Sequence, residues 1–442
     1  MTYNEKIMEE VKYLIEKGDN KTLKEYFSSL EIPDKAYLIA HLSDDEKLLV
    51  FSPLGIEEKT ELIPELDDYS MEVIIEALDA DELSKIANSL DVDEAVDLIA
   101  EVEDYRREQV VGKVKRSDQI RALLKFGPDT AAGIMTLKFM SINGKDNVST
   151  AQEELRKVRE EEEYKYIYIL DDDGRLKGYV TPWKILTSPP EKKLEELAED
   201  IHSVTADLDQ EAVANIAGDY DLLQVPVVDN FGHLLGVITI DDLVDVMEEE
   251  ATEDIQYLGG LGTIETAFYP TRRSFVFRLP WLYINLLTAL LAALVVGYFE
   301  DVIQAFIGAA IFMPVVAGMG GNAGTQTLSI MVRGLALGEV RYADIKRLLW
   351  KEIGVGFLTG FAVGVVTSLI AYFWKGSPLF GVVVGLALIL NHIAAGLFGV
   401  LIPLILDKVG VDPAHASSIF LTTVTDVFGF FALLGLTKVI MT

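Results

Sequence analysis

The sequence predicts a multidomain membrane protein: an acidic soluble part followed by an all-α bundle of five membrane-spanning helices. Of the chain's 442 residues, those at 271–442 include only 8 acidic and 11 basic side chains. Residues 1–270 therefore hold 62 acidic and 27 basic ones, and they contain two internal repeats. This acidity excludes nucleic acid as a partner, because Lys and Arg bind its phosphates. It favours small cations as binding partners.

Residues 1–130 are expected to form an α-helical solenoid because apolar residues recur every 12 positions. The chain has a second apolar residue three positions before each repeat residue, on the same helix face. Ser, Asp or Glu follows most repeat leucines and can cap the next helix. We expect short stacked helices, with the hand of the winding left open. The repeat residues are Leu30, Leu42, Leu54, Leu66, Leu78, Leu90, Val102 and Val114.

Acidic side chains fill the outward positions of these repeats. Asp93 and Asp97 are four residues apart, so on a helix their like charges lie side by side and repel. One interpretation is a solvated surface. The other is a cation-binding surface.

Residues 131–247 contain two copies of a small α/β unit. LDDDGRLKGYVT (170–181) is similar to VDNFGHLLGVIT (228–239) at an offset of 58, and an acidic helix at 150–161 matches one at 209–217. Each copy predicts strand, Asp/Gly turn, strand and then helix, and the pair resembles tandem CBS domains. A regulatory module is expected rather than an enzyme, since no nucleophile–base pair is present.

The CBS resemblance implies an adenine-nucleotide site in which a Thr and an Asp three residues later hold the ribose. Thr239 and Asp242 fit that pattern in the second copy. In the first copy, Lys184 follows Thr181 at that spacing, which argues against a nucleotide there. ATP therefore has only weak support as a ligand.

An acidic helix is predicted to leave the second α/β unit, and its end with the following linker occupies residues 248–270. Four acids recur along one helix face, and Glu250 and Asp254 form an adjacent pair. Divalent cations would cancel the repulsion, and Mg²⁺ prefers carboxylate oxygens and retained waters. A solvated acidic linker is the alternative. The four acids are Asp242, Asp245, Glu249 and Glu253.

Five apolar segments between 271 and 442 are long enough to cross a bilayer. Basic residues precede the first and fill the loop after the second, so both places are expected in the cytoplasm. The start of the chain lacks the apolar region of a signal peptide. We expect a plasma-membrane protein with a cytoplasmic N-terminus and an extracytoplasmic C-terminus. The segments are 281–299, 303–335, 351–373, 379–406 and 415–440.

The second span carries an unusual polar run. Pro314 and the residues from Gly318 to Gln326 are expected to interrupt the helix, as happens where backbone lines a watery path. A kinked helix whose glycines allow close packing is the alternative. Asn322 and Gln326 favour the watery path.

The last span contains Asp426, although an ionised residue in a membrane helix is costly and marks an ion path or a buried pair. No Lys or Arg lies in the interior of a span, away from its ends, to pair with it, and His392 and His415 are the candidate partners. Thr422 and Thr425 add oxygens nearby, although hydrogen bonds from them to a structural Asp are the alternative. A conducting path is more easily built at the two-fold axis of a homodimer, where a divalent cation resolves the repulsion of two carboxylates.

Taken together, these parts resemble the MgtE family of magnesium channels along the whole chain. Its most specific motifs are PVVAGMGGNAGTQ (314–326), EEEATEDI (248–255) and TTVTDVFG (422–429). The resemblance implies a homodimeric Mg²⁺ channel that closes when cytosolic Mg²⁺ is high. It places Asp426 and Asn322 in the pore, beside Gly321. The expected regulatory residues are Asp93, Asp97, Glu211, Asp221, Asp242, Asp245, Glu249, Glu253 and Asp254.

Two other functions remain open from the sequence. One is an ion-coupled secondary transporter that exchanges a divalent cation for H⁺ or Na⁺, with Asp426 carrying the proton. The other is a membrane-tethered sensor that moves nothing. An enzyme is not expected, since the soluble part has no Gly-rich phosphate loop or catalytic triad. The absence of cysteine excludes disulfides and thiolate metal sites.

Overall fold

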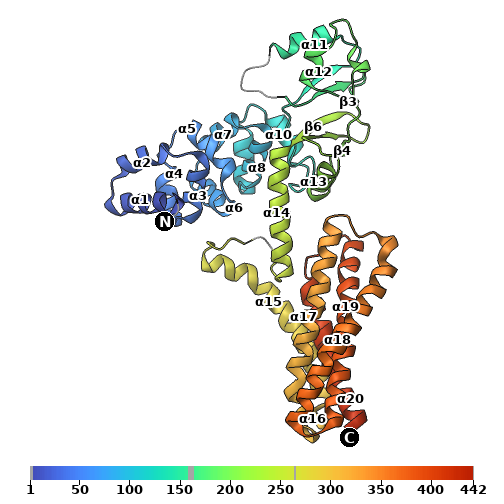
Figure 1. Ribbon diagram of the computed structural model, residues 1–442. Coiled ribbons are helices and arrows are strands. Elements are labelled where there is room, and N and C mark those ends of the chain that lie inside the picture. Colours follow the sequence, from blue (N-terminus) through green and yellow to red (C-terminus); the bar gives the residue numbers. More distant parts are fainter. Residues whose placement is uncertain (1–2, 158–163, 263–264, 442) are drawn as a thin grey trace. The chain divides into compact units, whose positions relative to one another are not determined.

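The computed structural model describes residues 3–157, 164–262 and 265–441 (Figure 1). The chain divides into two compact units, Met1–Met247 and Glu248–Thr442, and each is described by itself. The first contains a helical array and two small sheets. The second contains long helices.

The helical array begins its helices at the spacing that the repeat leucines predict. From α3 onward, the starts at Ile32, Asp44, Ile56, Asp68, Ala80, Val92 and Asp104 are 12 residues apart. The array comprises α1 (Tyr3–Lys17), α2 (Asn20–Ser28), α3 (Ile32–His41), α4 (Asp44–Phe51), α5 (Ile56–Leu62), η1 (Ile63–Glu65), α6 (Asp68–Ala77), α7 (Ala80–Ser89), α8 (Val92–Ala100), α9 (Asp104–Val111) and α10 (Ser117–Leu123).

The polar residue that follows most repeat leucines helps to explain where these helices begin. The Asp67 carboxylate accepts from the Ser70 amide at 3.1 Å, and that of Asp79 accepts from the Glu82 amide at 2.8 Å. Each bond satisfies an amide that has no partner within the helix. The expected capping role is therefore confirmed at these positions.

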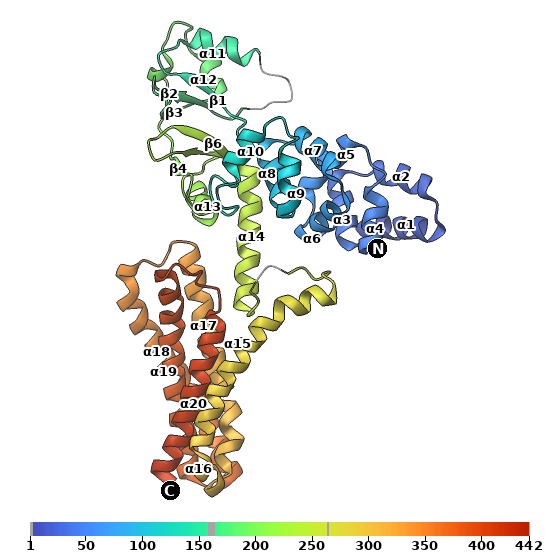
Figure 2. The ribbon, with the colours of Figure 1, turned by 180° about the vertical axis from the view of Figure 1, so that it is seen from behind.

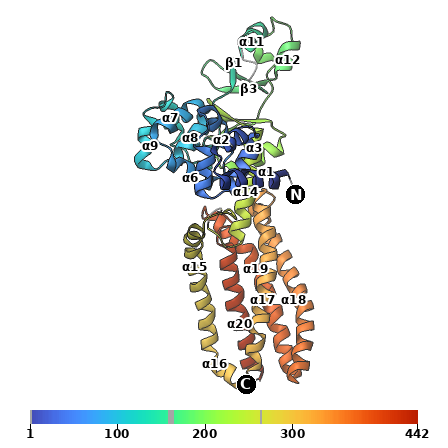
Figure 3. The ribbon, with the colours of Figure 1, turned by 90° about the vertical axis from the view of Figure 1, so that its left-hand side faces the viewer.

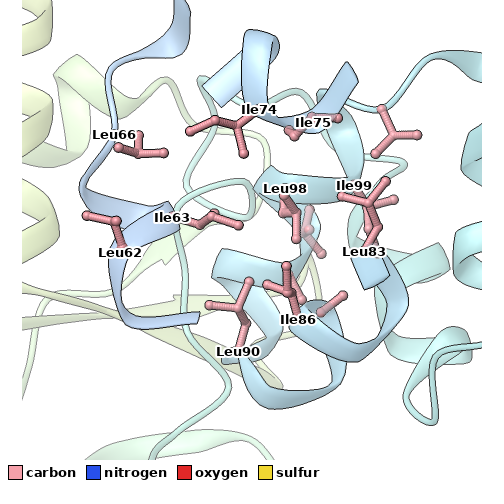
Figure 4. Close-up of a cluster of buried hydrophobic side chains, with 14 of the residues drawn as sticks. Leu62, Ile63, Leu66, Ile74, Ile75, Leu83, Ile86, Leu90, Leu98 and Ile99 are labelled. Atoms are coloured by element: carbon pink, nitrogen blue, oxygen red, sulfur yellow. The ribbon is translucent and has the colours of Figure 1, made fainter. Parts of the chain in front are cut away.

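Several helices pack against the helix two further along the chain, as α4 does against α6, α5 against α7 and α7 against α9. The repeat residues Leu66 and Leu90 lie in the buried cluster of Figure 4, among isoleucines of neighbouring helices. Buried lysines also join helices: Lys47 Nζ donates to Ser70 Oγ at 2.8 Å, and Lys59 Nζ to Glu82 Oε1 at 2.5 Å. Such polar partners offset the cost of burying an ammonium group.

The two α/β copies have the same topology (Figure 2). In each sheet the first strand pairs parallel with the second, and the second pairs antiparallel with the third. The elements are β1 (Met140–Asn143), α11 (Val148–Leu155), β2 (Ile167–Leu170), β3 (Leu176–Val180), α12 (Pro182–Thr187) and η2 (Leu194–Glu196), then β4 (Val204–Thr205), α13 (Gln210–Asp219), β5 (Gln224–Val228), β6 (Leu234–Thr239) and α14 (Ile240–Leu258).

The two copies contain the same turn at positions that are 58 residues apart. Asp171 Oδ1 accepts from the Arg175 amide at 2.9 Å, and Asp229 Oδ1 accepts from the His233 amide at 2.8 Å. The turn glycines have φ of +82° and +87°, a conformation that favours glycine. The acidic helix predicted at 150–161 ends earlier, at Leu155, and residues 158–163 lie outside the described part of the chain.

The second unit contains long helices that run alongside one another (Figure 3). Four helical segments, Thr271–Tyr298, Tyr342–Lys375, Pro378–Lys408 and Ser417–Met441, are long and apolar enough to cross a membrane. The second predicted span, 303–335, corresponds to α17, which has 29 residues but is not among these four segments, so the count of five stays a prediction. The elements are α15 (Thr271–Tyr298), α16 (Glu300–Ala305), α17 (Gly308–Ala336), η3 (Tyr342–Asp344), α18 (Ile345–Lys375), α19 (Pro378–Lys408) and α20 (Ser417–Met441).

The expected interruption of the second span is wrong, because α17 continues through both Pro314 and the glycine run. Its glycines serve close packing instead: Asn391 fills the space where a side chain on Gly320 would lie, and Leu421 packs on Gly324. The Thr325 hydroxyl donates back to the Gly321 carbonyl at 3.0 Å. Polar residues are thus accommodated without breaking the helix.

Candidate functional site

The structure brings together three of the predicted regulatory acids, from α8 and from the first turn of α14. Asp93 and Asp97 lie one turn apart on α8, and Asp242 contributes to the electrostatic repulsion at both. Leu243 and Val246 of α14 are buried in the same hydrophobic core as α8, which sets Asp242 against that helix. We call Asp93, Asp97 and Asp242 the acidic cluster.

Burial and mutual repulsion disfavour negative charge in the acidic cluster. Burial, followed by the charges of Asp91, Glu94 and Asp242, raises the pKa of Asp93 to about 6. Burial, followed by Asp93 and Asp242, raises the pKa of Asp97 to about 7. Asp97 is nevertheless exposed on α8, so solvent screens part of this repulsion.

Two influences on the pKa of Asp242 oppose each other. Burial raises its pKa, whereas hydrogen bonds from Thr239 lower it. The Thr239 hydroxyl donates to Asp242 Oδ2 at 2.5 Å. The predicted nucleotide pair is therefore hydrogen-bonded together, and Asp242 belongs to both predicted roles. In the first copy, the Lys184 ammonium pairs with Glu199 at 2.7 Å.

The acidic cluster has one feature that suits a cation. Asp93 Oδ1 is buried without a hydrogen-bond partner, and such an acceptor requires a donor or an ion to satisfy it. Within the described residues, no three His, Asp or Glu side chains converge in a geometry that holds a metal directly. An ion here would therefore keep much of its water, as Mg²⁺ commonly does.

The row of acids predicted along one face of α14 is confirmed as part of one helix. Asp245 is exposed one turn after Asp242 and helps to raise its pKa. Glu249 and Glu253 continue the same face. The row thus extends the negative potential of the acidic cluster along α14.

Asp254 lies beside residues that the sequence reasoning missed. Burial, then Asp412 and Glu253, raise its pKa to about 6, whereas Arg333 opposes the rise. Asp412 also accepts from the His415 amide at 3.2 Å, in the loop before α20. Asp254 and Asp412 are far apart along the chain, so no sequence motif links them.

Glu211 and Asp221 are not joined to the acidic cluster. Glu211 lies in the first turn of α13 and Asp221 just beyond its end, so about 15 Å of helix separates them. Neither is among the charges that shift the pKa of Asp93 or Asp97. Their regulatory role stays a prediction.

In the second unit, α17 carries a stripe of polar side chains that are exposed in the single chain. Asn322, Thr325, Gln326 and Ser329 line a surface pocket of about 700 Å³. We call these four residues the polar stripe. Only Asn322 was predicted as a site residue. The spacing of i, i+3, i+4 and i+7 was visible in the sequence, but the expected break in the helix concealed it.

Helix α20 places Asp426 next to this region. Gly321 of α17 lies opposite Thr425, whose Oγ1 is 3.9 Å from where a Cβ on that glycine would be. Asn322 is the residue after Gly321, and Asp426 is the residue after Thr425. Thr425 is buried, whereas Thr422 is exposed and Asp426 is half-buried.

The alternative of a structural Asp426 held by threonines is not supported. The hydroxyls of Thr422, Thr423 and Thr425 all donate to main-chain carbonyls of their own helix, at 2.7, 2.7 and 3.0 Å. His392, a candidate partner of Asp426, instead has its Nδ1 2.8 Å from the Leu388 carbonyl of its own helix. Within the described part of the chain, Asp426 has no ion pair and no hydrogen bond to a side chain.

Comparison with known proteins identifies all parts of the chain. The family model MgtE, described as a divalent cation transporter, matches residues 313–436. The model of the MgtE intracellular N domain matches residues 9–129, and that of the CBS domain matches 131–191 and 194–249. The crystal structure of the cytosolic domain of the Mg²⁺ channel MgtE in complex with ATP aligns at 27% identity and a TM-score of 0.48, over 53% of this chain and 98% of that one.

Two curated relatives extend the match. The magnesium transporter MgtE of Thermus thermophilus is 34% identical over 330 residues, which cover 73% of this chain and 72% of the relative. The magnesium transporter MgtE of Bacillus subtilis is 30% identical over 443 residues, which cover 99% of this chain and 97% of the relative. The chain belongs to the MgtE family.

Proposed function

We propose that this protein is a homodimeric Mg²⁺ channel of the plasma membrane that mediates magnesium uptake and closes when Mg²⁺ binds its acidic cytosolic part. The observation that carries the proposal is Asp426. It is a half-buried carboxylate with no ion pair among the described residues, in a helix apolar enough to span a membrane. Such a residue is costly in lipid and by default marks an ion path.

The polar stripe supplies the rest of the path. Asn322, Thr325 and Ser329 offer oxygen atoms on an exposed face of α17 next to α20. Polar side chains of this kind are unfavourable against lipid, so the face requires water or a protein partner. A second copy of the chain meets that need, and it brings a second Asp426 to the ion. Two carboxylates suit a divalent ion that remains largely hydrated.

Closure follows from the acidic cluster by mass action. An ion that binds only the closed arrangement stabilises it by an amount that grows with free Mg²⁺. Mg²⁺ would neutralise the repulsion among Asp93, Asp97 and Asp242 and would require their deprotonated forms. Asp245, Glu249, Glu253 and Asp254 extend the negative face of α14. Glu211 of α13 and Asp221 just beyond the end of that helix provide further acids.

ATP is a weaker part of the proposal. A related cytosolic domain has been solved with ATP. Here Thr239 and Asp242 retain the expected pair, although Asp242 also belongs to the acidic cluster. ATP and Mg²⁺ are then expected to influence each other at this residue.

The alternative is an ion-coupled transporter, which the same observation favours because a half-buried unpaired carboxylate can also carry a proton. Mg²⁺ uptake by proteoliposomes, with and without a proton or sodium gradient, separates the two. A channel conducts along the Mg²⁺ gradient alone. Uptake that requires an opposing H⁺ or Na⁺ gradient would contradict the channel, and no uptake under any gradient would leave the tethered sensor.

A further inference from the structure

We propose that Glu352 of α18 and Asn391 of α19 are positioning residues that fix the rotation of α17 about its own axis. Their hydrogen bonds keep the polar stripe turned away from the helix bundle. The inference rests on the proposed ion path along that stripe, and it assigns roles to two buried polar residues that the path itself does not use.

Asn391 anchors the first half of α17. The residue is fully buried, and its Nδ2 donates to the Val316 carbonyl at 2.9 Å. Its side chain fills the space left open by Gly320 of α17 and Gly429 of α20. A buried amide is costly without partners, and Oδ1 of Asn391 has none among the described residues, so the bond from Nδ2 to Val316 is the contact that favours one orientation of α17. Neither glycine can be replaced without displacing Asn391.

Glu352 anchors the second half. Its side chain is only 6% exposed, and Oε2 accepts from the Thr327 hydroxyl of α17 at 3.1 Å. Oε1 lies 2.9 Å from the Lys351 ammonium, which is 55% exposed. The lysine compensates the buried charge from the surface, so the carboxylate remains an acceptor for Thr327.

The two anchors act on the same side of α17. Val316 and Thr327 are eleven residues apart, which is about three helical turns, so they lie on one face. Asn322 and Ser329 lie roughly on the opposite face. Burial agrees with this geometry, because Val316 and Thr327 are buried whereas Asn322 and Ser329 are exposed.

The polar anchors act together with close packing, because Asn391 and Leu421 of neighbouring helices fill the space beside two glycines of α17. The face of α17 toward its neighbours includes Gly320 and Gly324, which present no side chains to interlock. Association between helices in lipid relies on close packing and hydrogen bonds rather than on the hydrophobic effect. Loss of the anchors is therefore expected to weaken the preference of α17 for this rotation, although its buried apolar side chains still pack against the bundle.

The absence of cysteine from the sequence allows a direct test of rotation. Ser329→Cys places a thiol in the polar stripe, and Leu328→Cys places one at a fully buried neighbour. Reaction with a water-soluble thiol reagent is measured for each in proteoliposomes. With the anchors intact, only the thiol at position 329 is expected to react rapidly.

Thr327→Val keeps the shape of the side chain but removes the hydroxyl. We expect it to reduce the ratio of the two reaction rates by about tenfold, the effect of losing one buried hydrogen bond to a charged acceptor. Glu352→Leu and Asn391→Leu are expected to act in the same direction. Thr327→Ser and Glu352→Gln, which retain the donor or an acceptor, are expected to preserve most of the ratio.

Thr367→Val is the matched control. Thr367 is also buried, but its hydroxyl donates to the Val363 carbonyl within its own helix at 2.9 Å, so the ratio should not change. The inference is overturned if the anchor variants leave the ratio unchanged, even when Mg²⁺ flux falls. A ratio that depends on the anchors in a protein that conducts no Mg²⁺ would support the inference and reject the proposed function.

Discussion

The two groups of carboxylates differ in how the protein surrounds them. In the acidic cluster, Asp242 lies close enough to Asp93 and Asp97 to raise the pKa of both. In the membrane half, Asp426 has no ion pair among the described residues, and the neutral side chains of Asn322 and Thr425 lie in the same region. Acids that repel one another are stabilised by a bound cation, so such a group can respond to the concentration of that cation. A single acid beside neutral oxygens attracts an ion without holding it tightly. The difference is the one expected between a sensor and a path.

Removing the Asp426 charge is expected to have the largest effect. Asp426→Asn should lower Mg²⁺ flux in proteoliposomes by well over about tenfold, since attraction to a divalent ion exceeds the ~1.4 kcal/mol that a factor of ten represents. Asp301→Asn, an exposed acid on α16, is the control and should conduct normally. Normal flux through Asp426→Asn would remove the distinction between path and sensor.

Neutralising the acidic cluster should instead change closure. In Asp93→Asn with Asp242→Asn, we expect the cytosolic Mg²⁺ needed for half-closure to rise by about tenfold or more, while maximal flux is retained. Asp118→Asn, an exposed acid on α10, serves as the control. Loss of maximal flux in the double variant would mean that the two groups of carboxylates do not have separate roles.

Closure should also depend on pH. Mg²⁺ competes with protons for Asp93, whose pKa is about 6, and for Asp97, whose pKa is about 7. Below these values both carboxyls are protonated, so more Mg²⁺ is needed to close the channel at about pH 6 than at about pH 8. The shift should diminish in Asp93→Asn with Asp97→Asn. An equal shift in that variant would assign the pH dependence to other groups.

The smallest expected effect is on stability. The folded-state pKa of Asp93 is raised from 3.8 to about 6, so its stabilising contribution is present below pH 3.8 and is lost as pH rises through about 6. At about pH 8 in EDTA, Asp93→Asn should therefore stabilise the protein by about 1–2 kcal/mol. Thermal unfolding of the purified full chain measures this. A destabilised variant would contradict the repulsion inferred for the acidic cluster.

The helical array and α17 differ in how much of their structure can be predicted from the sequence. In the helical array, local signals decide the structure: a repeat leucine, a capping residue and a new helix follow every 12 residues. These rules act within a few residues, so the sequence displays them. A local motif also singled out Thr239 and Asp242, as a nucleotide pair, and the structure shows a hydrogen bond between them.

In α17 the outcome depended on distant partners. Gly320 and Asn322 resemble a helix break when considered locally, but Asn391 occupies the space beside Gly320 from 71 residues further along the chain. The link between Asp254 and Asp412 is missed for the same reason. Residues that meet only through tertiary packing leave no local pattern in a single sequence.

The central claim is that Mg²⁺ at the acidic cytosolic residues closes a path that Asp426 forms. Single-channel recording in a bilayer, with Mg²⁺ varied on the cytosolic side alone, tests it most directly. Unitary Mg²⁺ currents should disappear as cytosolic Mg²⁺ rises in the wild type, but persist in Asp93→Asn with Asp242→Asn. Currents that close equally in both proteins would contradict the assignment of the acidic cluster as the sensor.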